Sequence, residues 1–475
     1  MDRATFLRRS AAGVGLLAFP ALARAGGGAK LASLRAAVRG PVLTPASAGY
    51  DAARQVFDSA YASIRPLAVV QPLDANDVAA VVHWAAAHGE HVVAKSGGHS
   101  YAGYSTTTGV VVDLSRLAGI AVKPGRATIG AGARLGNIYD RLNAHGAAIP
   151  AGSCPTVGIG GHVLGGGFGL ASRAWGLASD NLLSVQIVTA DGKVRVVDAH
   201  HDPDLFWACR GGGGGNFGIA TSFAFRTHAV SQGAYFVGTW PWTQVEEVVA
   251  SYLAWAPKQP DALGAVCRLA GPSSAPTVQV FGQYLGSAAA LTAALASLTP
   301  PAAKLTVAPS TWLDLVRRWA GCLSHTLPQC AAPVPQSFAG ASDYIARQPA
   351  AAQLARFREA LEQPGAQSGS LLIDAYGGAL NRVAPAATAF VHRGQLASIQ
   401  YFAAGPGASA RTWVDGARAL LRPVVSGEAY VNYIDPHLTD WQTAYYGANL
   451  PRLRRVKKTV DPHGLFRFPQ SIPPA

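Results

Sequence analysis

The sequence predicts an α+β protein in which a glycine-rich part is followed by a second α+β part, an antiparallel sheet covered by helices. Three observations carry this prediction. The chain has 475 residues, enough for two or three domains. Short apolar strands and helices follow one another in mixed order between residues 66 and 197, as in α+β folds. Near Val230 the glycines thin out and another series of strands and helices begins, which indicates a second domain.

The composition indicates a folded protein with a basic surface. Hydrophobic residues make up 49% of the chain and charged residues 14%, which excludes a disordered protein. The formal net charge is +13, but Lys and Arg are scattered, and no basic run is interleaved with aromatic residues. A solvated basic surface explains this charge better than nucleic-acid binding, and we expect no nucleic-acid partner.

The first 25 residues indicate an export signal. Arg3, Arg8 and Arg9 form a basic start, a short apolar stretch covers residues 11–19, and small residues at 21–25 would permit cleavage. The arginine pair resembles a twin-arginine signal, a route for proteins already folded around a cofactor. An ordinary secretory signal and a fortuitous N-terminus are the alternatives. No segment is long and apolar enough for a membrane anchor, so we expect an exported protein, periplasmic or secreted.

The part between residues 66 and 197 is predicted to alternate short strands with helices. Asp74 or Asn76 is a suitable N-cap for a helix from Val78 to His88. The pair Asp191-Gly192 predicts the turn of a hairpin. The other expected elements are strands at Pro66–Val70, Val92–Ala94, Val110–Leu114 and Ala127–Ile129, a helix at Leu135–His145, and hairpin strands at Leu183–Val188 and Lys193–Val197.

The middle of the chain is predicted to form the second α+β part. The final segment, Tyr430–Pro474, is again dense in aromatic and basic residues, and we expect it to return to the first part. The expected elements of the middle part are strands at Tyr235–Trp240, Val278–Tyr284, Leu371–Tyr376 and Leu396–Phe402, and helices at Val245–Trp255, Ala288–Leu298 and Ala408–Leu421.

The five cysteines are odd in number, so at least one thiol lies outside any set of disulfides. Cys322 and Cys330 either form a disulfide in an oxidising compartment or are small buried side chains. No pair of cysteines has zinc-like spacing with a histidine nearby, and we expect no metal.

The glycine run at residues 213–218 matches the G-x-G-x-x-G pattern literally but not in its context. A dinucleotide fold needs an apolar strand before the run and an acidic residue about 20 positions later. Here Asp204–Ala208 precedes the run, and Gly233–Trp240 contains no Asp or Glu. The pattern therefore does not indicate a Rossmann site. Its glycines are better explained as backbone that closely approaches a bound group.

The segment Lys95–Ser100 follows an expected strand and carries two adjacent glycines. Successive N–H groups of such a turn can converge on an anion such as a pyrophosphate. Lys95 would add a positive charge beside this nest, and His99 would end it with a free ring. A tight turn with a surface histidine explains the segment equally well.

A longer glycine-rich run extends over residues 152–181. We expect neither helix nor strand among its glycines, because each glycine costs backbone entropy in a regular element. A flexible linker is the plain alternative, but the run also carries Cys154, His162, Arg173 and Asp180. A flat, extended ligand lying against the backbone explains this combination better.

These segments resemble the berberine bridge enzyme-like branch of the vanillyl-alcohol-oxidase superfamily. The resemblance covers the chain from about Pro66 to the C-terminus, and its motifs are highly specific. It implies an FAD-dependent oxidoreductase with a PCMH-type FAD-binding domain built from both chain ends and an inserted substrate domain. The motifs are KSGGHS at 95–100, CPTVGIGGHVLGGGFG at 154–169, GLASDN at 176–181, RGGGGGNFG at 210–218, YVNY at 430–433 and QSIP at 470–473.

The resemblance also implies where the domains begin and end. After the signal at 1–25 we expect the FAD-binding domain at 26–229, with a PCMH-type core at about 64–230. The substrate-binding domain is expected at 230–428, and a C-terminal berberine-bridge-like segment at 429–475.

Two covalent bonds to FAD are implied by the same resemblance. His99 would bond to the flavin 8α-methyl and Cys154 to C6, while His162 matches a residue near the N1–C2 oxygen side. Such a flavin is more electrophilic and cannot wash out after export. The implied cofactor-binding residues are His99, Cys154, Lys95, Ser96, Gly97, Gly98, Ser100, Val157, Gly158, Gly161, His162, Gly165, Gly218, Ile219 and Asn432.

Alcohol oxidation needs a base for the hydroxyl proton while hydride passes to flavin N5. Members that couple C–C bonds place a Glu where this chain has Gln400, which cannot act as a base. Plant alcohol-oxidising members carry a Lys where this chain has Ser398. Sugar-oxidising members use a tyrosine of a Tyr-x-Asn-Tyr motif together with a carboxylate. The implied catalytic set is Tyr433 as the base, with Asp374 as orienter and proton acceptor, and with Tyr430, Tyr101 and Gln400 around them; core packing is the alternative for Tyr430.

The resemblance favours an oxidase over a dehydrogenase, because Val157 is small and is expected to leave room for O2 near flavin C4a. The leading function is oxidation of a hydroxyl on a sugar, an oligosaccharide, or an aromatic or polyketide alcohol of secondary metabolism. An oxidative-cyclisation enzyme of natural-product biosynthesis is the second reading, disfavoured by Gln400. A flavin-loaded binding protein without turnover is the third. We expect a monomer with a small-molecule substrate.

Overall fold

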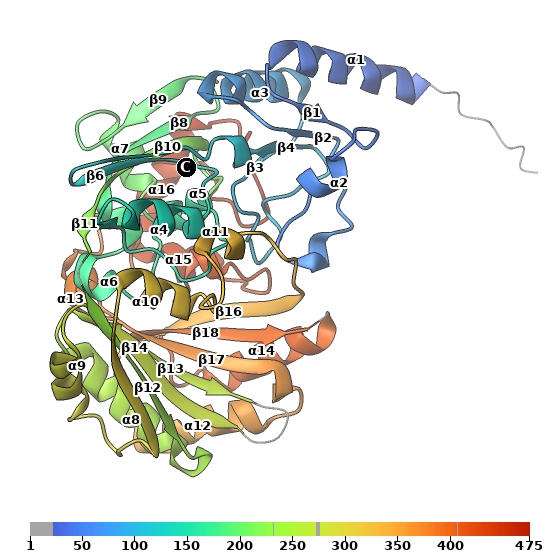
Figure 1. The fold of residues 1–475 in the computed structure, drawn as a ribbon. Coiled ribbons are helices and arrows are strands. Elements are labelled where there is room, and N and C mark those ends of the chain that lie inside the picture. Colours follow the sequence, from blue (N-terminus) through green and yellow to red (C-terminus); the bar gives the residue numbers. More distant parts are fainter. Residues whose placement is uncertain (1–21, 231, 272–275, 406) are drawn as a thin grey trace, which may run out of the picture.

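The computed structural model describes residues 22–230, 232–271, 276–405 and 407–475 (Figure 1). In the view of Figure 1 the upper part contains both ends of the described chain, and the lower part is built on one large sheet. Most of the expected export signal lies outside the described residues, and 22–25 belong to the helix α1 (Leu22–Ala37). Within the described ranges, none of the helices has the length and apolar character needed to cross a membrane.

The first sheet of the upper part has four strands in the order β1-β2-β4-β3. β2, β4 and β3 run parallel, and most of their residues are buried, as expected for parallel strands covered on both faces. Asp74 caps α3 by accepting the N–H groups of Asn76 and Asp77. The bounds are β1 Val42–Leu43, α2 Tyr50–Ala53, β2 Ala68–Val70, α3 Ala75–His88, β3 Val92–Lys95 and β4 Val110–Asp113.

The second sheet of the upper part is antiparallel, with the order β5-β6-β10-β8-β9. β8 and β9 form the expected hairpin, and short helices connect the strands. A separate two-stranded antiparallel sheet is formed by β7 and β11. The bounds are β5 Ile120–Lys123, β6 Arg126–Gly130, α4 Leu135–Asn143, β7 Ala147–Ala148, α5 Ile159–Leu164, α6 Ser172–Trp175, β8 Leu182–Val188, β9 Val194–Val197, α7 Pro203–Ala208, β10 Ile219–Arg226 and β11 His228–Ala229.

The lower part is a seven-stranded antiparallel sheet in the order β15-β12-β14-β13-β17-β18-β16. Buried residues of α8, α9, α12 and α14 form one core with alternate residues of the strands. The bounds are β12 Gly233–Trp240, α8 Val245–Trp255, β13 Leu263–Ala270, β14 Thr277–Tyr284, α9 Ala288–Leu295, β15 Lys304–Ser310, β16 Phe338–Ile345, α12 Ala351–Glu362, β17 Gly369–Ala375, α13 Gly378–Arg382, β18 Ala397–Ala404 and α14 Ala408–Leu421.

Two segments beyond the first 230 residues pack in the upper core. The final segment contains α15 (Trp441–Tyr446) and α16 (Leu450–Val460). Its residues Tyr445 and Phe466 belong to the same hydrophobic core cluster as Val70 of β2. From the middle of the chain, α10 (Trp312–Trp319) and α11 (Leu327–Cys330) pack on α4. The expected bounds of the domains remain a prediction. They do not include the packing of α10 and α11 on the upper part of the molecule.

Cys322 and Cys330 are joined in a disulfide, which decides between the two readings of this pair. The bond closes the short loop between α10 and α11. Cys154, Cys209 and Cys267 are free thiols.

The expectation that the long glycine run contains no helix is wrong. α5 and α6 both lie inside it, and α5 contains Gly160 and Gly161. The reason is close packing: a Cβ at Gly160 would lie 2.9 Å from the carbonyl oxygen of Ala131. The gain from packing the helix this tightly outweighs the entropy cost of the two glycines.

The aspartate of the GLASDN motif makes a buried ion pair instead of lining a ligand site. Asp180 receives two parallel N–H bonds from Arg393, of 2.8 and 2.7 Å, and the Arg393 side chain is 1% exposed. We expect Asp180→Ala to lower the free energy of unfolding by about 3–5 kcal/mol, because it leaves a buried guanidinium unpaired. Urea unfolding measures this. Asp204→Ala, which breaks the surface pair with Arg452, is the control and should change stability by less than about 1 kcal/mol; equal losses would contradict the assignment.

Candidate active site

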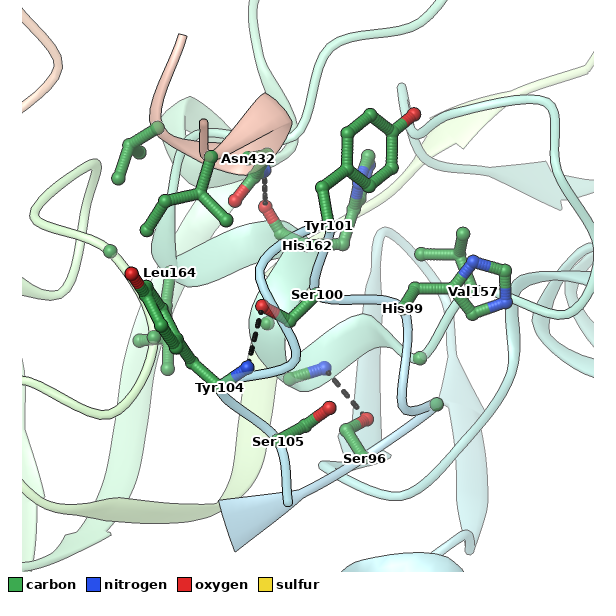
Figure 2. Close-up of a pocket in the computed structure, with 18 of the residues that line it drawn as sticks. Ser96, His99, Ser100, Tyr101, Tyr104, Ser105, Val157, His162, Leu164 and Asn432 are labelled. Carbon is green, nitrogen blue, oxygen red and sulfur yellow. Dashed lines mark hydrogen bonds between the residues drawn. The ribbon is translucent and has the colours of Figure 1, made fainter. Parts of the chain in front are cut away.

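A cavity of about 610 Å³ lies between the two parts of the molecule. Its walls come from the loop after β3, the two glycine runs, the strands β17 and β18, and the final segment. Figure 2 shows part of it, with His99, Ser100 and Tyr101 on the loop after β3 and Asn432 above them. All the site residues expected from the sequence line this cavity except Lys95 and Gly165.

Lys95 points away from the cavity, which corrects its expected place beside the anion nest. Its ammonium donates to the carbonyls of Ala53 and Gln55 and lies 3.6 Å from the Asp113 carboxylate. Lys95 is the last residue of β3, and side chains alternate along a strand, so it faces away from Ser96. The positive charge of Lys95 therefore pairs with the Asp113 carboxylate inside the protein.

Gly165 also lies outside the cavity lining, but for a different reason. A Cβ at this position would be 2.0 Å from the side-chain oxygen of Asn432. The Asn432 amide in turn donates to the carbonyl of His162 and to the hydroxyl of Tyr430, both over 2.8 Å. Because Gly165 has no side chain, Asn432 has room to reach the cavity wall.

The loop after β3 lines the cavity and contains hydrogen-bond donors without an acceptor among the described residues. In the part of the chain that the structure describes, the N–H groups of Gly97, Gly98 and His99 have no acceptor. The hydroxyl of Ser105, which also lines the cavity, is buried without a partner among the described residues. Donors left open in this way suit an anionic group such as a pyrophosphate.

The loop after β3 and the long glycine run meet at the cavity wall. A Cβ at Gly97 would lie 2.3 Å from the backbone nitrogen of Gly158, and one at Gly158 would lie 2.1 Å from the Ser96 hydroxyl. Gly161, by contrast, is exposed, and a Cβ there would meet no atom within 4 Å. A bare backbone surface beside open donors fits a flat cofactor with a diphosphate, as FAD has.

His99 is held on both sides. Its ring stacks on Phe57 with centroids 3.9 Å apart, and its Nε2 is 2.8 Å from the hydroxyl of Thr156. The same hydroxyl lies 3.3 Å from the sulfur of Cys154. Burial, helped by the nearby charge of Arg134, lowers the pKa of His99 to about 3, so the ring is neutral.

His162 is held as a neutral ring of known tautomer. Its Nε2 accepts the N–H of Gly152 over 3.0 Å, which leaves its proton on Nδ1. Burial lowers the pKa of His162 to about 4. The residue lines the cavity and can offer its Nδ1–H as a donor.

The oxygen of Tyr430 is occupied by three N–H donors. These are the backbone groups of Gly167 and Phe168, at 2.9 and 3.3 Å, and the amide of Asn432. Burial raises the pKa of Tyr430 to about 12 against the effect of these donors. Tyr430 is also 4% exposed, and its ring packs with Phe390.

The surroundings of the Tyr433 hydroxyl differ from those of the Tyr430 hydroxyl. The Tyr433 hydroxyl has no hydrogen-bond partner among the described residues, and the Tyr433 ring stacks on Tyr101 at 5.5 Å. Burial and the neighbouring Asp374 hold the pKa of Tyr433 well above its usual range. Burial also raises the pKa of Asp374 to about 7. Gln400 donates its amide to the hydroxyl of Tyr101 over 2.7 Å.

The strand pattern explains why these side chains converge. On β17 and β18, Leu371, Ile373, Ile399 and Tyr401 belong to the lower core. The residues between them therefore face the other side of the sheet. Those that line the cavity are Leu372, Asp374, Gln400 and Phe402.

Several cavity residues were not expected from the sequence. Phe338 and Phe402 stack on each other at 5.4 Å, and Phe338 meets the ring of Tyr101 edge-on at 4.7 Å. Phe57 and Ser105 lie in loops without a motif, and no pattern in the sequence distinguishes them. Among the described residues, no group of three His, Cys, Asp or Glu side chains is placed to hold a metal ion.

Comparisons with known proteins agree with this geometry. A family model described as "FAD binding domain" matches residues 66–198, and one described as "Berberine and berberine like" matches residues 429–473. The chain is 35% identical to the uncharacterized FAD-linked oxidoreductase YgaK of Bacillus subtilis over 395 residues, which cover 80% of this chain and 85% of that protein.

A named enzyme and a solved structure are also similar. Over 441 residues the chain is 33% identical to the xylooligosaccharide oxidase of Thermothelomyces thermophilus, covering 86% of this chain and 88% of that enzyme. The solved structure of BBE-like 1 from Physcomitrella patens matches with a TM-score of 0.87 and 31% identity, covering 94% of this chain and 99% of the other. The expected fold class is confirmed, and the chain belongs to the berberine bridge enzyme-like family of FAD-linked oxidoreductases.

Proposed function

We propose that this enzyme oxidises a hydroxyl of a sugar or oligosaccharide, with Tyr433 as the base. The observation that carries the proposal is the contrast between the two tyrosines of the YVNY motif. Tyr430 has its oxygen occupied by three N–H donors, whereas the Tyr433 hydroxyl is open to the cavity beside Asp374. A base must have a free oxygen within reach of the substrate proton.

Tyr433 and Asp374 divide the proton transfer between them. A phenol whose pKa is raised this far is protonated in the resting enzyme, so Tyr433 can accept the substrate proton only while passing on its own. Asp374, with a pKa of about 7, is a suitable final acceptor. Gln400 and Tyr101 form a polar pair that can orient the substrate. When bound, FAD supplies the hydride acceptor.

We also propose the two covalent attachments, at His99 and Cys154. Both side chains line the cavity and share a contact with one hydroxyl, that of Thr156. Because Nε2 of His99 is engaged by Thr156, Nδ1 is the atom available for a bond. Cys154 is a partly exposed free thiol, whereas Cys209 and Cys267 are buried. Ser96–Ser100, Val157, Gly158, Gly161, His162, Gly218, Ile219 and Asn432 would hold the rest of the cofactor.

O2 as the electron acceptor, a monomeric state and export remain parts of this proposal. Val157 is half-buried and lines the cavity, which is compatible with a path for O2. The disulfide between Cys322 and Cys330 suits an oxidising compartment outside the cytoplasm. The twin-arginine pair itself lies outside the described residues.

An aromatic alcohol is the second candidate substrate. Phe338, Phe402 and Tyr101 form an aromatic group in the cavity wall. Such rings stack on other rings, but they also pack against the apolar faces of sugars. A carboxylate in place of Gln400 would have favoured C–C coupling, and its absence argues against oxidative cyclisation.

The deciding experiment is anaerobic mixing with a panel of oligosaccharides, monosaccharides and aromatic alcohols. Bleaching of the flavin absorbance by a sugar supports the proposal, and bleaching by aromatic alcohols alone supports the second candidate. No bleaching by any hydroxyl compound would overturn both. Mixing the reduced enzyme with air-saturated buffer then tests the oxidase assignment, because slow reoxidation would indicate a dehydrogenase.

The pH dependence of turnover tests the role of Asp374. The carboxylate can accept a proton only when ionised, so we expect kcat/KM to rise with pH and to level off above the Asp374 pKa of about 7. Asp374→Asn should lower kcat/KM and remove this step from the profile. A wild-type profile that falls through pH 7, or an unchanged step in the Asn variant, would contradict the assignment.

A further inference from the structure

Thr156 lies behind the cavity wall, between the two side chains proposed to hold the cofactor. Its hydroxyl oxygen is 2.8 Å from His99 Nε2 and 3.3 Å from Cys154 Sγ. The residue is 7% exposed and does not line the cavity itself. Its backbone oxygen would lie 2.9 Å from a Cβ at Gly97, so Thr156 sits where the loop after β3 touches the long glycine run. The backbone of Thr156 is therefore packed closely against the loop after β3.

Counting the protons shows what this hydroxyl can do. A neutral histidine carries one ring proton, and a threonine hydroxyl donates one hydrogen bond while accepting others. In one arrangement Nε2–H donates to the Thr156 oxygen, and the hydroxyl hydrogen is left for Cys154. In the other, the hydroxyl donates to Nε2, and the ring proton sits on Nδ1.

The first arrangement fits the surroundings better. Nδ1 of His99 has no acceptor among the described residues, so a proton there would have no partner in the protein. With the proton on Nε2, both the ring hydrogen and the hydroxyl hydrogen have an acceptor, and the hydrogen left without a protein partner is the S–H of Cys154, a weak donor. Nδ1 then presents a lone pair, the state that a nitrogen needs to form a bond. A hydroxyl that donates to sulfur also favours the thiolate, the reactive form of cysteine.

We propose that Thr156 is the positioning residue for both flavin attachments. It keeps the His99 proton on Nε2, so that Nδ1 is free to bond, and directs its own hydroxyl hydrogen to Cys154 Sγ. The inference rests on the proposed function, since it assumes bonds at His99 and Cys154. At His99 a C–H bond of the flavin 8α-methyl would break and a C–N bond would form at Nδ1, after which the ring would lose its Nε2 proton. At Cys154 a C–H bond at flavin C6 and the S–H bond would be replaced by one C–S bond. In each attachment the two protons and two electrons removed would convert one O2 into H2O2.

The test compares Thr156→Val and Thr156→Ala with Thr156→Ser. The purified proteins are denatured in acid, and the flavin bound to the His99 and Cys154 peptides is measured by mass spectrometry. We expect the Val and Ala variants to bind FAD but to lose about tenfold or more of the linkage at both peptides, the effect of one lost hydrogen bond of ordinary to strong size. The Ser variant keeps the hydroxyl and should retain both bonds.

Thr221→Val is the matched control, because the Thr221 hydroxyl is also buried and bonds to Gln186 on β8, away from the cavity lining. It should keep both bonds. Complete linkage in the Val and Ala variants, or loss at only one peptide, would overturn the proposal. If neither variant accumulates as folded yellow protein, incomplete linkage in the Ser variant overturns it and complete linkage supports it. Wild-type protein that releases all its flavin in acid refutes the covalent proposal itself, before any variant is examined.

Discussion

Tyr433→Phe is expected to lower kcat by about 10²- to 10⁴-fold while the protein stays folded and yellow. The hydroxyl that this change removes has no partner among the described residues, so its loss leaves no buried donor or acceptor unsatisfied. The stacking of the ring on Tyr101 is retained. The effect should therefore fall on proton transfer, which anaerobic flavin reduction by the substrate measures directly.

Tyr430→Phe gives the contrast that makes this result specific. It removes an oxygen that accepts N–H groups from Gly167, Phe168 and Asn432. Leaving such donors unsatisfied costs about 1–3 kcal/mol each, so we expect a clear loss of thermal stability in this variant. Full turnover in Tyr433→Phe, with the loss of turnover found only in Tyr430→Phe, would transfer the role of the base to Tyr430.

Many of the regular elements with apolar patterns were predictable from the sequence, but α10, α12, α16 and β10, which also carry large apolar residues, were not among the expected elements. All the expected strands and helices are present with their ends shifted by a few residues. The missed strands β13 and β16 both contain Gly and Ala, which have little β propensity of their own. These strands need small residues because other parts of the protein approach them closely. A Cβ at Gly264 in β13 would lie 1.9 Å from the Leu170 carbonyl, and one at Gly340 in β16 would lie 2.7 Å from the ring of Tyr101.

The site was predictable where a motif marks it and unpredictable where only tertiary contacts do. His99, Cys154 and Tyr433 stand in motifs, and the structure brings all three to one cavity. Lys95 also stands in a motif, but the alternation of β3 turns it toward Asp113. Phe57 is a site residue that no motif marks. Its ring stacks on His99 from a separate loop, and no local sequence pattern predicts this contact.

Gly161→Ala is expected to yield a folded protein with little or no FAD. Gly161 lies in α5, its side-chain position meets no protein atom within 4 Å, and it faces the cavity. Alanine favours a helix over glycine by about 1 kcal/mol, so the unliganded protein should be at least as stable as before. The added methyl group occupies space only where a flat cofactor would lie against the backbone. Flavin content per protein, measured by absorbance, should fall steeply.

Gly158→Ala separates a cofactor clash from a folding defect. Its Cβ would lie 2.1 Å from the Ser96 hydroxyl and 2.2 Å from the backbone nitrogen of Gly97, so it should push the long glycine run away from the loop after β3 and destabilise the protein itself. Both variants are then expected to lack flavin, but only Gly158→Ala should lose stability when unliganded. If Gly161→Ala instead binds a full complement of FAD, the cofactor does not lie against α5. The assignment of this wall to the flavin would then be wrong, whatever the fate of the Gly158 variant.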